Sequence, residues 1–308
     1  MRWKERGTRE KLFSPFRGYS IWYRLVGDQG TADTWPLLCL HGCPGAIYDY
    51  LEPLSALAQG GRRIVLYDQL GCGRSAHPHD PSLWTVQLYV EEIAAVRQAL
   101  GLHDVHLFGQ SWGGMLALEY AVTRPLGLKS LILADTPAST AQFVAELNRL
   151  RAELPLEVQA TLAQHEAAGT TNEPAYQEAV MVFYRRHMCR LDPWPDCLNR
   201  TFAGMAQWPE VYRTMWGPSE FHFTGTLREW RIEDGLGEIR VPTLVLGGRY
   251  DEVTPAMTET LHRGISGSEW VIFEQSAHMP HLEETELYLE TVNAFLARVE
   301  ATTQPGLA

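Results

Sequence analysis

The stretch Gly-Gln-Ser-Trp-Gly-Gly, at positions 109–114, constrains the fold of this chain more than any other part of its sequence. An apolar run with the length of a buried strand precedes it, and a segment with helical spacing follows it. Between a strand and a helix, Gly-x-Ser-x-Gly forms a nucleophile elbow, a sharp turn that projects the serine hydroxyl from the top of a sheet. Gly109 and Gly113 lack a Cβ, which lets such a turn close. We therefore expect Ser111 to be a nucleophile at the end of a strand.

Strand-like and helix-like segments alternate through much of the chain. Apolar runs that are typical of strands lie within 12–26 and at 37–40, 64–67, 105–108, 131–134, 243–248 and 270–273. Helices are expected near 50–58, at 85–100, after the elbow, through about 265, and at 283–299. This alternation predicts an α/β fold with a mostly parallel sheet and helices on both faces. The tail at 301–308 is expected to be disordered.

The alternation breaks between residues 136 and 234. This part has helical stretches at 141–150 and 176–187, shows no clear buried strand, and is dense in aromatic residues. We interpret 137–233 as a helical cap inserted after the sixth strand, with 1–136 and 234–308 forming the core. The alternative is a second helical core whose aromatic residues have no role in binding a ligand.

Three polar residues that follow strands have the chain order of a catalytic triad. A serine hydroxyl is a weak nucleophile until a base takes its proton, and that base is usually a histidine held by a carboxylate. After a nucleophile elbow the order is serine, then acid, then histidine, and Ser111, Asp251 and His278 obey it. Asp135 also ends a strand and is the alternative acid. His281 is a less favoured alternative base because it lies at the start of a helix.

An acyl-transfer site also needs hydrogen-bond donors for the oxyanion, and backbone N–H groups serve because they are fixed in place. One donor is expected to be Trp112, directly after the nucleophile. The other is expected in the loop after the 37–40 strand, at Cys43. The Cys43 thiol is an alternative nucleophile, although nothing in the sequence supplies it with a base. His41, in the same loop, is expected to be a hydrogen-bonded turn residue.

Six motifs together give the chain a family resemblance. They are His41-Gly-Cys-Pro-Gly45, Asp68-Gln-Leu-Gly-Cys-Gly-Arg-Ser75, Gly109-Gln-Ser-Trp-Gly-Gly114, Trp216-Gly-Pro-Ser-Glu-Phe221, Tyr250-Asp-Glu-Val-Thr-Pro255 and Ser276-Ala-His278. With these motifs the chain resembles the proline iminopeptidases, cytosolic serine aminopeptidases of the α/β-hydrolase fold that include the tricorn-interacting aminopeptidase. It departs from their usual His-Gly-Gly-Pro-Gly motif, because Cys43 takes the place of the middle glycine.

The resemblance implies an α/β-hydrolase fold and a Ser-His-Asp enzyme that releases an N-terminal residue, preferably proline, from short peptides. It also implies that Glu220 and Glu252 bind the free α-amine of the substrate. An ammonium ion taken into a dry pocket needs such an anionic partner. The alternatives are that Glu220 lies on the surface of the cap and that Glu252 caps the helix near Pro255. No metal or cofactor motif is present, so neither is expected.

Two other functions stay open at this point. Related amino-acid amidases share these motifs, so an amidase or a small-ester hydrolase on the same triad is the first alternative. The second is a hydrolase-fold binding protein that has lost catalysis. Such proteins usually lose a member of the triad, whereas this chain keeps all three candidates.

The resemblance implies a small peptide or an amino-acid amide as the substrate, and composition argues against other kinds of partner. The formal net charge is −11 and there is no basic run, which argues against nucleic acid and anionic membranes. No apolar run is long enough to span a bilayer, and the polar N-terminus does not resemble a signal peptide.

Five cysteines suggest reduced thiols in a cytoplasm. The spacing of Cys189 and Cys197 from His187 fits no common zinc pattern.

Overall fold

Eight strands form a single sheet in the described part of the computed structural model, which covers residues 8–27, 34–220 and 223–303. The strands are β1 (Arg9–Phe16), β2 (Tyr19–Val26), β3 (Leu37–Leu40), β4 (Ile64–Tyr67), β5 (Val105–Gln110), β6 (Leu128–Ala134), β7 (Thr243–Gly248) and β8 (Glu269–Phe273). Their order is β1-β2-β4-β3-β5-β6-β7-β8. The first two pairings are antiparallel and the other five are parallel, which confirms the predicted mostly parallel sheet.

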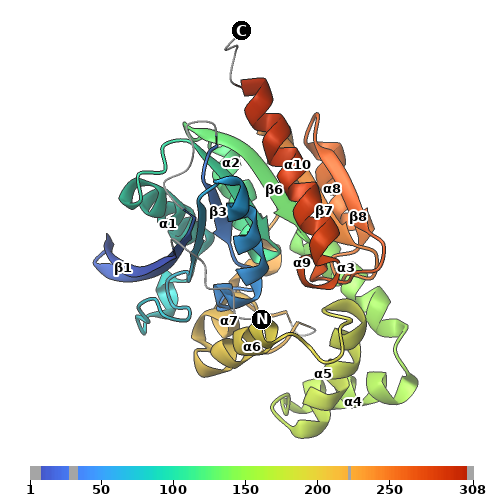
Figure 1. Cartoon of the computed structure of the whole chain (residues 1–308). Coiled ribbons are helices and arrows are strands. Elements are labelled where there is room, and N and C mark those ends of the chain that lie inside the picture. Colours follow the sequence, from blue (N-terminus) through green and yellow to red (C-terminus); the bar gives the residue numbers. More distant parts are fainter. Residues whose placement is uncertain (1–7, 28–33, 221–222, 304–308) are drawn as a thin grey trace.

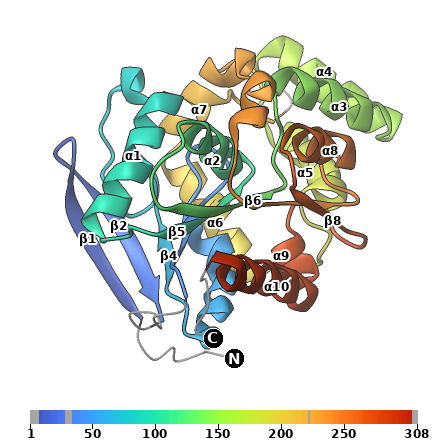
Figure 2. The ribbon, with the colours of Figure 1, turned by 90° about the horizontal axis from the view of Figure 1, so that it is seen from above.

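Helices cover both faces of this sheet, as Figure 2 shows. One face carries α1 (Val86–Ala99), α2 (Trp112–Val122) and α8 (Pro255–Gly264), and the short helix η2 (Pro81–Leu83) leads into α1. The other carries the 3₁₀ helix η1 (Tyr48–Gly60), α9 (Pro280–Glu283) and α10 (Thr285–Thr303). Side chains alternate along β3, so that Leu38 and Leu40 join the apolar cluster of the first face while Leu37 and Cys39 join that of the second. The continuous apolar run at 37–40 therefore marks a strand buried on both sides.

Helices fill the segment between β6 and β7, and Figure 1 shows four of them, α4 to α7, gathered at one end of the sheet. They are α3 (Thr140–Ala152), α4 (Leu156–Ala168), α5 (Pro174–His187), α6 (Asp196–Gln207), α7 (Glu210–Met215), η3 (Thr226–Glu229) and η4 (Glu233–Glu238). The sequence patterns predicted only α3 and α5 among them. Phe143 and Trp216 join the same apolar cluster as Trp112 of α2, so this segment packs directly on the core. The limits of a cap at 137–233 stay our interpretation.

Two local expectations need correction. The helix expected at 50–58 is a 3₁₀ helix that begins at Tyr48, and Pro53 lies inside it. A proline within a helix has no N–H to donate, which disfavours regular α-helical bonding there. The expected disordered tail begins too early, because residues 301–303 form the last turn of α10. The remainder of that tail lies outside the described residues.

A buried ion pair fastens α10 to the core, far from the strand ends that carry the predicted triad. Glu300 accepts hydrogen bonds from Arg62 at 2.6 and 2.9 Å and from the backbone N–H of Trp35 at 2.8 Å. Its Oε1 also lies 3.2 Å from the ring of His106 in β5. Burial would raise the pKa of Glu300, but hydrogen bonds from His106 and Arg62 outweigh burial and lower the pKa to about 2.

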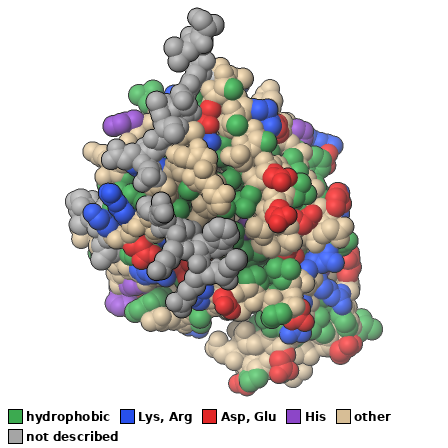
Figure 3. Space-filling view, in the orientation of Figure 1, with side chains coloured by type: hydrophobic (Ala, Val, Ile, Leu, Met, Phe, Trp, Pro, Cys, Tyr) green, Lys and Arg blue, Asp and Glu red, His purple; other side chains and the backbone are tan. Residues whose placement is uncertain are grey.

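The surface is mixed in charge. Figure 3 shows acidic and basic side chains interspersed on one face of the molecule, without a basic cluster on that face. No helix in the described ranges combines the length and apolarity that a bilayer span requires.

Candidate active site

The nucleophile turn lies between β5 and α2, in the strand-turn-helix setting that its motif predicts. Ser111 has φ 52° and ψ −116°, a left-handed conformation that a side chain with a Cβ rarely adopts. A Cβ on Gly109 would overlap the carbonyl oxygen of Gly113, and one on Gly113 would overlap that of Leu40. Glycine is therefore required at both positions, because neighbouring backbone atoms leave no room for a Cβ. The N–H of Ser111 donates to the carbonyl of Ala134 at 2.8 Å, which anchors the turn to β6.

The structure brings His278 and Asp251 together at the ends of neighbouring strands. Asp251 follows β7, and His278 follows β8. Nδ1 of His278 lies 2.6 Å from Oδ1 of Asp251, which also accepts the N–H of Val253 at 2.8 Å. Burial lowers the pKa of His278, but the charge and hydrogen bond of Asp251 outweigh burial. With Glu252 and Glu220 they raise the pKa to about 9. Ser111 and His278 line the same cavity.

The alternative acid and bases lie elsewhere in the hydrogen-bond network. Asp135 is buried beside Asp251, but the hydrogen bond of the imidazole goes to Asp251. Nε2 of His281 lies 3.1 Å from the carbonyl oxygen of Tyr50, and burial lowers its pKa to about 3. Nε2 of His41 accepts the N–H of Gln69, and burial lowers its pKa to about 4. Asp135, His281 and His41 are all absent from the lining of the cavity.

Two backbone N–H groups remain the candidates for the donors of an oxyanion hole. Trp112 is the first residue of α2, and the first N–H groups of a helix have no acceptor within it. The N–H of Cys43 finds no acceptor among the described residues. Cys43 has φ 48°, a conformation that glycine adopts without strain, which accounts for the glycine usual in the related motif. Burial raises the pKa of the Cys43 thiol, and the charges of Glu220 and Glu252 raise it further, so the side chain stays a thiol.

Sequence reasoning missed a hydrogen-bond chain that links three loops of the site. The N–H of Gly42 donates to the hydroxyl of Tyr50 at 2.6 Å, and that hydroxyl donates to Oε1 of Gln110 at 2.7 Å. Nε2 of Gln110 donates to the carbonyl of His278 at 3.2 Å. Gln110, the residue just before Ser111, is thereby linked through Tyr50 to the loop of Gly42 and directly to the loop of His278. The position of Gln110 inside the motif was the only available signal.

The cavity has a volume of about 270 Å³ and lies between the core and the helices α3, α5, α6 and α7. The core contributes the nucleophile turn and the loops around Cys43 and His278. The helical segment contributes much of its aromatic lining, which includes Phe143, Tyr176, Tyr184, Phe202, Tyr212 and Trp216. These aromatic residues border the cavity as well as packing with one another. A small apolar group could be enclosed there.

Two buried glutamates line this cavity. Glu220 is 6% exposed and Glu252 is 3% exposed. Oε1 of Glu220 accepts the hydroxyl of Tyr212 at 2.9 Å, whereas Oε2 of Glu252 has no hydrogen-bond partner among the described residues. Burial raises the pKa of Glu220 to about 7 and that of Glu252 well above its usual value. Glu220 is thus not a surface residue. No side-chain hydrogen bond caps the N-terminus of α8, so the alternative that Glu252 caps this helix finds no support.

The described ranges contain one candidate group of metal-ligating side chains. This group brings three suitable ligand atoms within 4.8 Å of one another, and it consists of Asp135, Asp251 and His278. It is the acid-imidazole pair already described, together with the neighbouring carboxyl. The five cysteines are all free, and Nδ1 of His187 lies 2.8 Å from the carbonyl oxygen of Tyr250.

Comparisons with known proteins bear on the fold and the family of the chain. The family model of the α/β-hydrolase fold matches residues 36–285. A proline iminopeptidase from Lactobacillus crispatus is 40% identical over 286 residues, covering 92% of this chain and 96% of the relative. The crystal structure of VinJ has a TM-score of 0.92 at 44% identity, over 94% of this chain and 99% of that one. The proline iminopeptidase structure from Mycobacterium smegmatis has a TM-score of 0.90 at 39% identity, over 96% of this chain and 100% of that one.

Proposed function

Because this chain belongs to the proline iminopeptidase family of the α/β hydrolases, we propose that it is a serine aminopeptidase that releases an N-terminal residue, preferably proline, from short peptides. The observation that carries the proposal is the pair of buried glutamates in the cavity that Ser111 and His278 also line. An uncompensated carboxylate in a dry cavity is costly, so its retention there favours a cationic ligand. A substrate with a free α-amine supplies that cation.

In the proposed mechanism, Nε2 of His278 removes the hydroxyl proton of Ser111, and the serine oxygen attacks the carbonyl carbon of the N-terminal residue. The carbonyl π pair moves to its oxygen, where the N–H groups of Cys43 and Trp112 stabilise the negative charge. The imidazolium then protonates the leaving amine, and the C–N bond breaks to leave an acyl-enzyme. Water, deprotonated by the same imidazole, hydrolyses that ester. Asp251 orients the imidazole and stabilises its charged form.

Recognition of the amine is assigned to Glu220 and Glu252. The free Oε2 of Glu252 and the carboxylate of Glu220 would receive hydrogen bonds from the substrate ammonium. The hydroxyl of Tyr212 already donates to Glu220 and fixes its orientation. Aromatic side chains of the helical segment would then enclose a small apolar side chain such as a proline ring. A longer peptide would have to enter with only its first residue in this part of the cavity.

A substrate series tests this proposal. Prolyl p-nitroanilide should be cleaved much faster than cyclopentanecarbonyl p-nitroanilide, which keeps the ring but replaces its amine by CH₂. Equal kcat/KM values for the two would contradict the proposed amine recognition. Prolinamide and p-nitrophenyl acetate separate the two alternatives, an amino-acid amidase and a small-ester hydrolase. Failure of a fluorophosphonate to label Ser111 in folded protein would instead favour a binding protein without catalysis.

We further propose that the protein works in the cytoplasm on peptide or amino-acid amide substrates, without a nucleic-acid or membrane partner. The free state of all five cysteines supports a reducing compartment. The net charge of −11 supports the exclusion of nucleic acid. Fractionation of the source cells, followed by an assay of prolyl p-nitroanilide cleavage, tests the location.

A further inference from the structure

Asp135 directly follows β6, and Asp251 lies in the loop after the neighbouring strand β7. The neighbouring strands β6 and β7 are parallel, and Ala134 is paired with Leu246. The N–H of Asp135 donates to the carbonyl of Leu246 at 2.8 Å, so its backbone is anchored to β7. Asp135 has φ 50°, a left-handed conformation that Asp and Asn tolerate better than most residues. Its side chain is fully buried.

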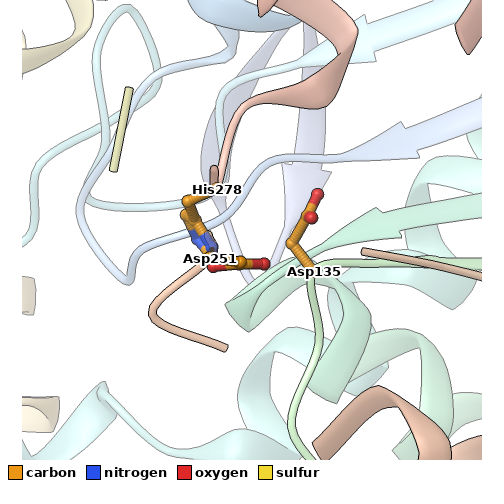
Figure 4. A group of neighbouring side chains, drawn as sticks. All are labelled: Asp135, Asp251 and His278. Carbon is orange, nitrogen blue, oxygen red and sulfur yellow. Dashed lines mark hydrogen bonds and ion pairs between the residues drawn. The ribbon is translucent and has the colours of Figure 1, made fainter. Parts of the chain in front are cut away.

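The carboxyl groups of Asp135 and Asp251 are close together and incompletely paired. Oδ1 of Asp251 already serves the imidazole of His278 and the N–H of Val253, whereas its Oδ2 has no partner among the described residues. Both oxygens of Asp135 are likewise without a hydrogen-bond partner in this part of the chain. Ligand atoms of Asp135, Asp251 and His278 lie within 4.8 Å of one another. Figure 4 shows the carboxylate of Asp251 between the ring of His278 and the side chain of Asp135.

Two buried carboxylates at such a separation repel each other, so the pair retains one proton. The proton does not belong on Asp251, because the imidazole and a backbone N–H stabilise the charged form of that group. Asp135 has no such imidazole, and the nearby backbone N–H of Gly248, which favours its charged form, is outweighed by burial and by the charge of Asp251. Burial and the charge of Asp251 raise the pKa of Asp135 well above its usual value, and the charge of Glu283 on α9 adds to this. The phenols of Tyr50 on η1 and Tyr288 on α10, which also face Asp135, contribute no charge at neutral pH.

We propose that Asp135 is a neutral positioning residue, whose carboxyl O–H donates a hydrogen bond to Oδ2 of Asp251 and holds that carboxylate against the imidazole of His278. The inference rests on the triad role of Asp251 and His278 proposed above. That hydrogen bond would give a partner to the carboxyl oxygens of both residues that now lack one. Asp135 does not line the cavity, so its effect on the reaction passes through Asp251 alone.

The neutral state of Asp135 has a consequence for the base. A second negative charge beside Asp251 would stabilise the imidazolium further and keep His278 protonated at higher pH. A neutral donor does the opposite, because it withdraws charge from Asp251 while fixing its orientation. Asp135 thus keeps Asp251 oriented without raising the pKa of His278, so the fraction of His278 that is present as free base is not reduced.

Two substitutions test the inference without introducing backbone strain. In Asp135→Asn the amide N–H can replace the carboxyl O–H, and Asn tolerates the left-handed conformation. We expect kcat on prolyl p-nitroanilide to stay within about threefold and the acidic limb of the kcat/KM profile to be unchanged. Asp135→Gly also accepts φ 50° but removes the donor. We expect its kcat to fall about tenfold or more, since a hydrogen bond to a charged group is lost, while KM changes less than about twofold.

Several outcomes would overturn the inference. One is an Asp135→Asn variant whose acidic limb moves down by about one pH unit, because that would mean a negative charge had been removed. A loss of kcat in Asp135→Asn as large as in Asp135→Gly, or a normal kcat in Asp135→Gly, would also contradict it. If Asp135→Gly fails to fold, the pH profile of Asp135→Asn still decides the charge. Asp251→Asn, measured in parallel, tests the triad separately: full activity there would contradict the triad proposal, whatever the result at Asp135.

Discussion

The backbone N–H of Glu252 donates a 3.2 Å hydrogen bond to the carbonyl of His187, the last residue of α5. The ring of His187 also contacts the loop of Glu252, because its Nδ1 lies 2.8 Å from the carbonyl oxygen of Tyr250. The loop is therefore bonded to the helical segment at Tyr250 and at Glu252, on either side of Asp251. Any movement of α5 would shift the carboxylate that we assign to the substrate amine, which couples substrate recognition to the position of that helix.

Substitution of either glutamate should weaken recognition of the substrate amine without impairing the chemical step. Glu252→Gln and Glu220→Gln each remove one negative charge with little change in volume. We expect each to lower kcat/KM on prolyl p-nitroanilide by about 100-fold, because a buried partner of the ammonium is lost. Cyclopentanecarbonyl p-nitroanilide, which has no amine, is the matched control and should lose less than about threefold. Parallel losses on both substrates would mean that the glutamates serve the fold or the triad instead.

The pH dependence should differ between neutral and cationic substrates. His278 acts only as free base, so activity is lost as pH falls through its pKa, which is about 9 in the empty site. The kcat/KM profile for p-nitrophenyl acetate should therefore rise up to about pH 9. A bound ammonium offsets the charges of Glu252 and Glu220 that help to raise this pKa. The acidic limb of kcat for prolyl p-nitroanilide should then lie at least about one unit lower. Superimposable limbs for the two substrates would argue against an ammonium bound beside His278.

Cys43→Gly should keep the enzyme active. The proposed oxyanion donor is the backbone N–H of Cys43, and its left-handed φ of 48° is unstrained for glycine. We expect kcat within about threefold of the original value, because the loss of an oxyanion donor itself would cost about 100-fold or more. The measurement is steady-state kinetics on prolyl p-nitroanilide. A loss of that larger size would show that the Cys43 side chain takes part in the reaction.

Glu300→Gln should destabilise the fold while sparing catalysis. It leaves the buried Arg62 without its carboxylate, a change that costs about 3–5 kcal/mol when one partner of a buried pair is removed. The folded pKa of Glu300 is depressed to about 2, so its stabilising contribution is complete above the unfolded value of about 4.5 and is lost as pH falls from there towards 2. Urea unfolding should show the full loss of stability at pH 7 and a smaller loss at pH 3, where part of the contribution of Glu300 is already gone.

The partly exposed pair Arg298–Glu269 provides the control for that experiment. Glu269→Gln should change the unfolding free energy by less than about 1 kcal/mol. Refolded Glu300→Gln should have unchanged kcat, since Glu300 and Arg62 do not line the cavity. An equal effect of the two substitutions on stability would refute the assignment of a buried, stabilising network.

Local patterns were sufficient for the parts of the fold that depend on near neighbours. The strands at 37–40 and 64–67 agree with the structure to the residue, because a short run that is apolar on both faces fits little else. The strand at 243–248 also agrees to the residue, the limits of most other elements differ by one to several residues, and α4, α6 and α7 were not expected. Of the thirteen residues in α4, only Leu162 is buried, so its sequence carries little helical periodicity.

Relationships between distant residues were beyond the sequence. Asp135 and Asp251 entered as competing candidates for one role, and the structure instead places them side by side. The bonds from Gln110 to Tyr50 and to the His278 carbonyl join residues 60 and 168 positions apart, a distance that no periodic pattern spans. Chain order did suggest Ser111, Asp251 and His278 as a set, because a parallel sheet brings the carboxyl ends of its strands to one edge.

The most direct measurement of the central proposal is site-resolved labelling of the nucleophile. The folded protein is treated with a fluorophosphonate for increasing times, and peptide mass spectrometry is compared with residual cleavage of prolyl p-nitroanilide. We predict that the adduct forms on Ser111 and that activity falls in direct proportion to it, while Ser111→Ala takes up no label. Loss of activity without an adduct on Ser111, or full activity with Ser111 completely modified, would contradict the account.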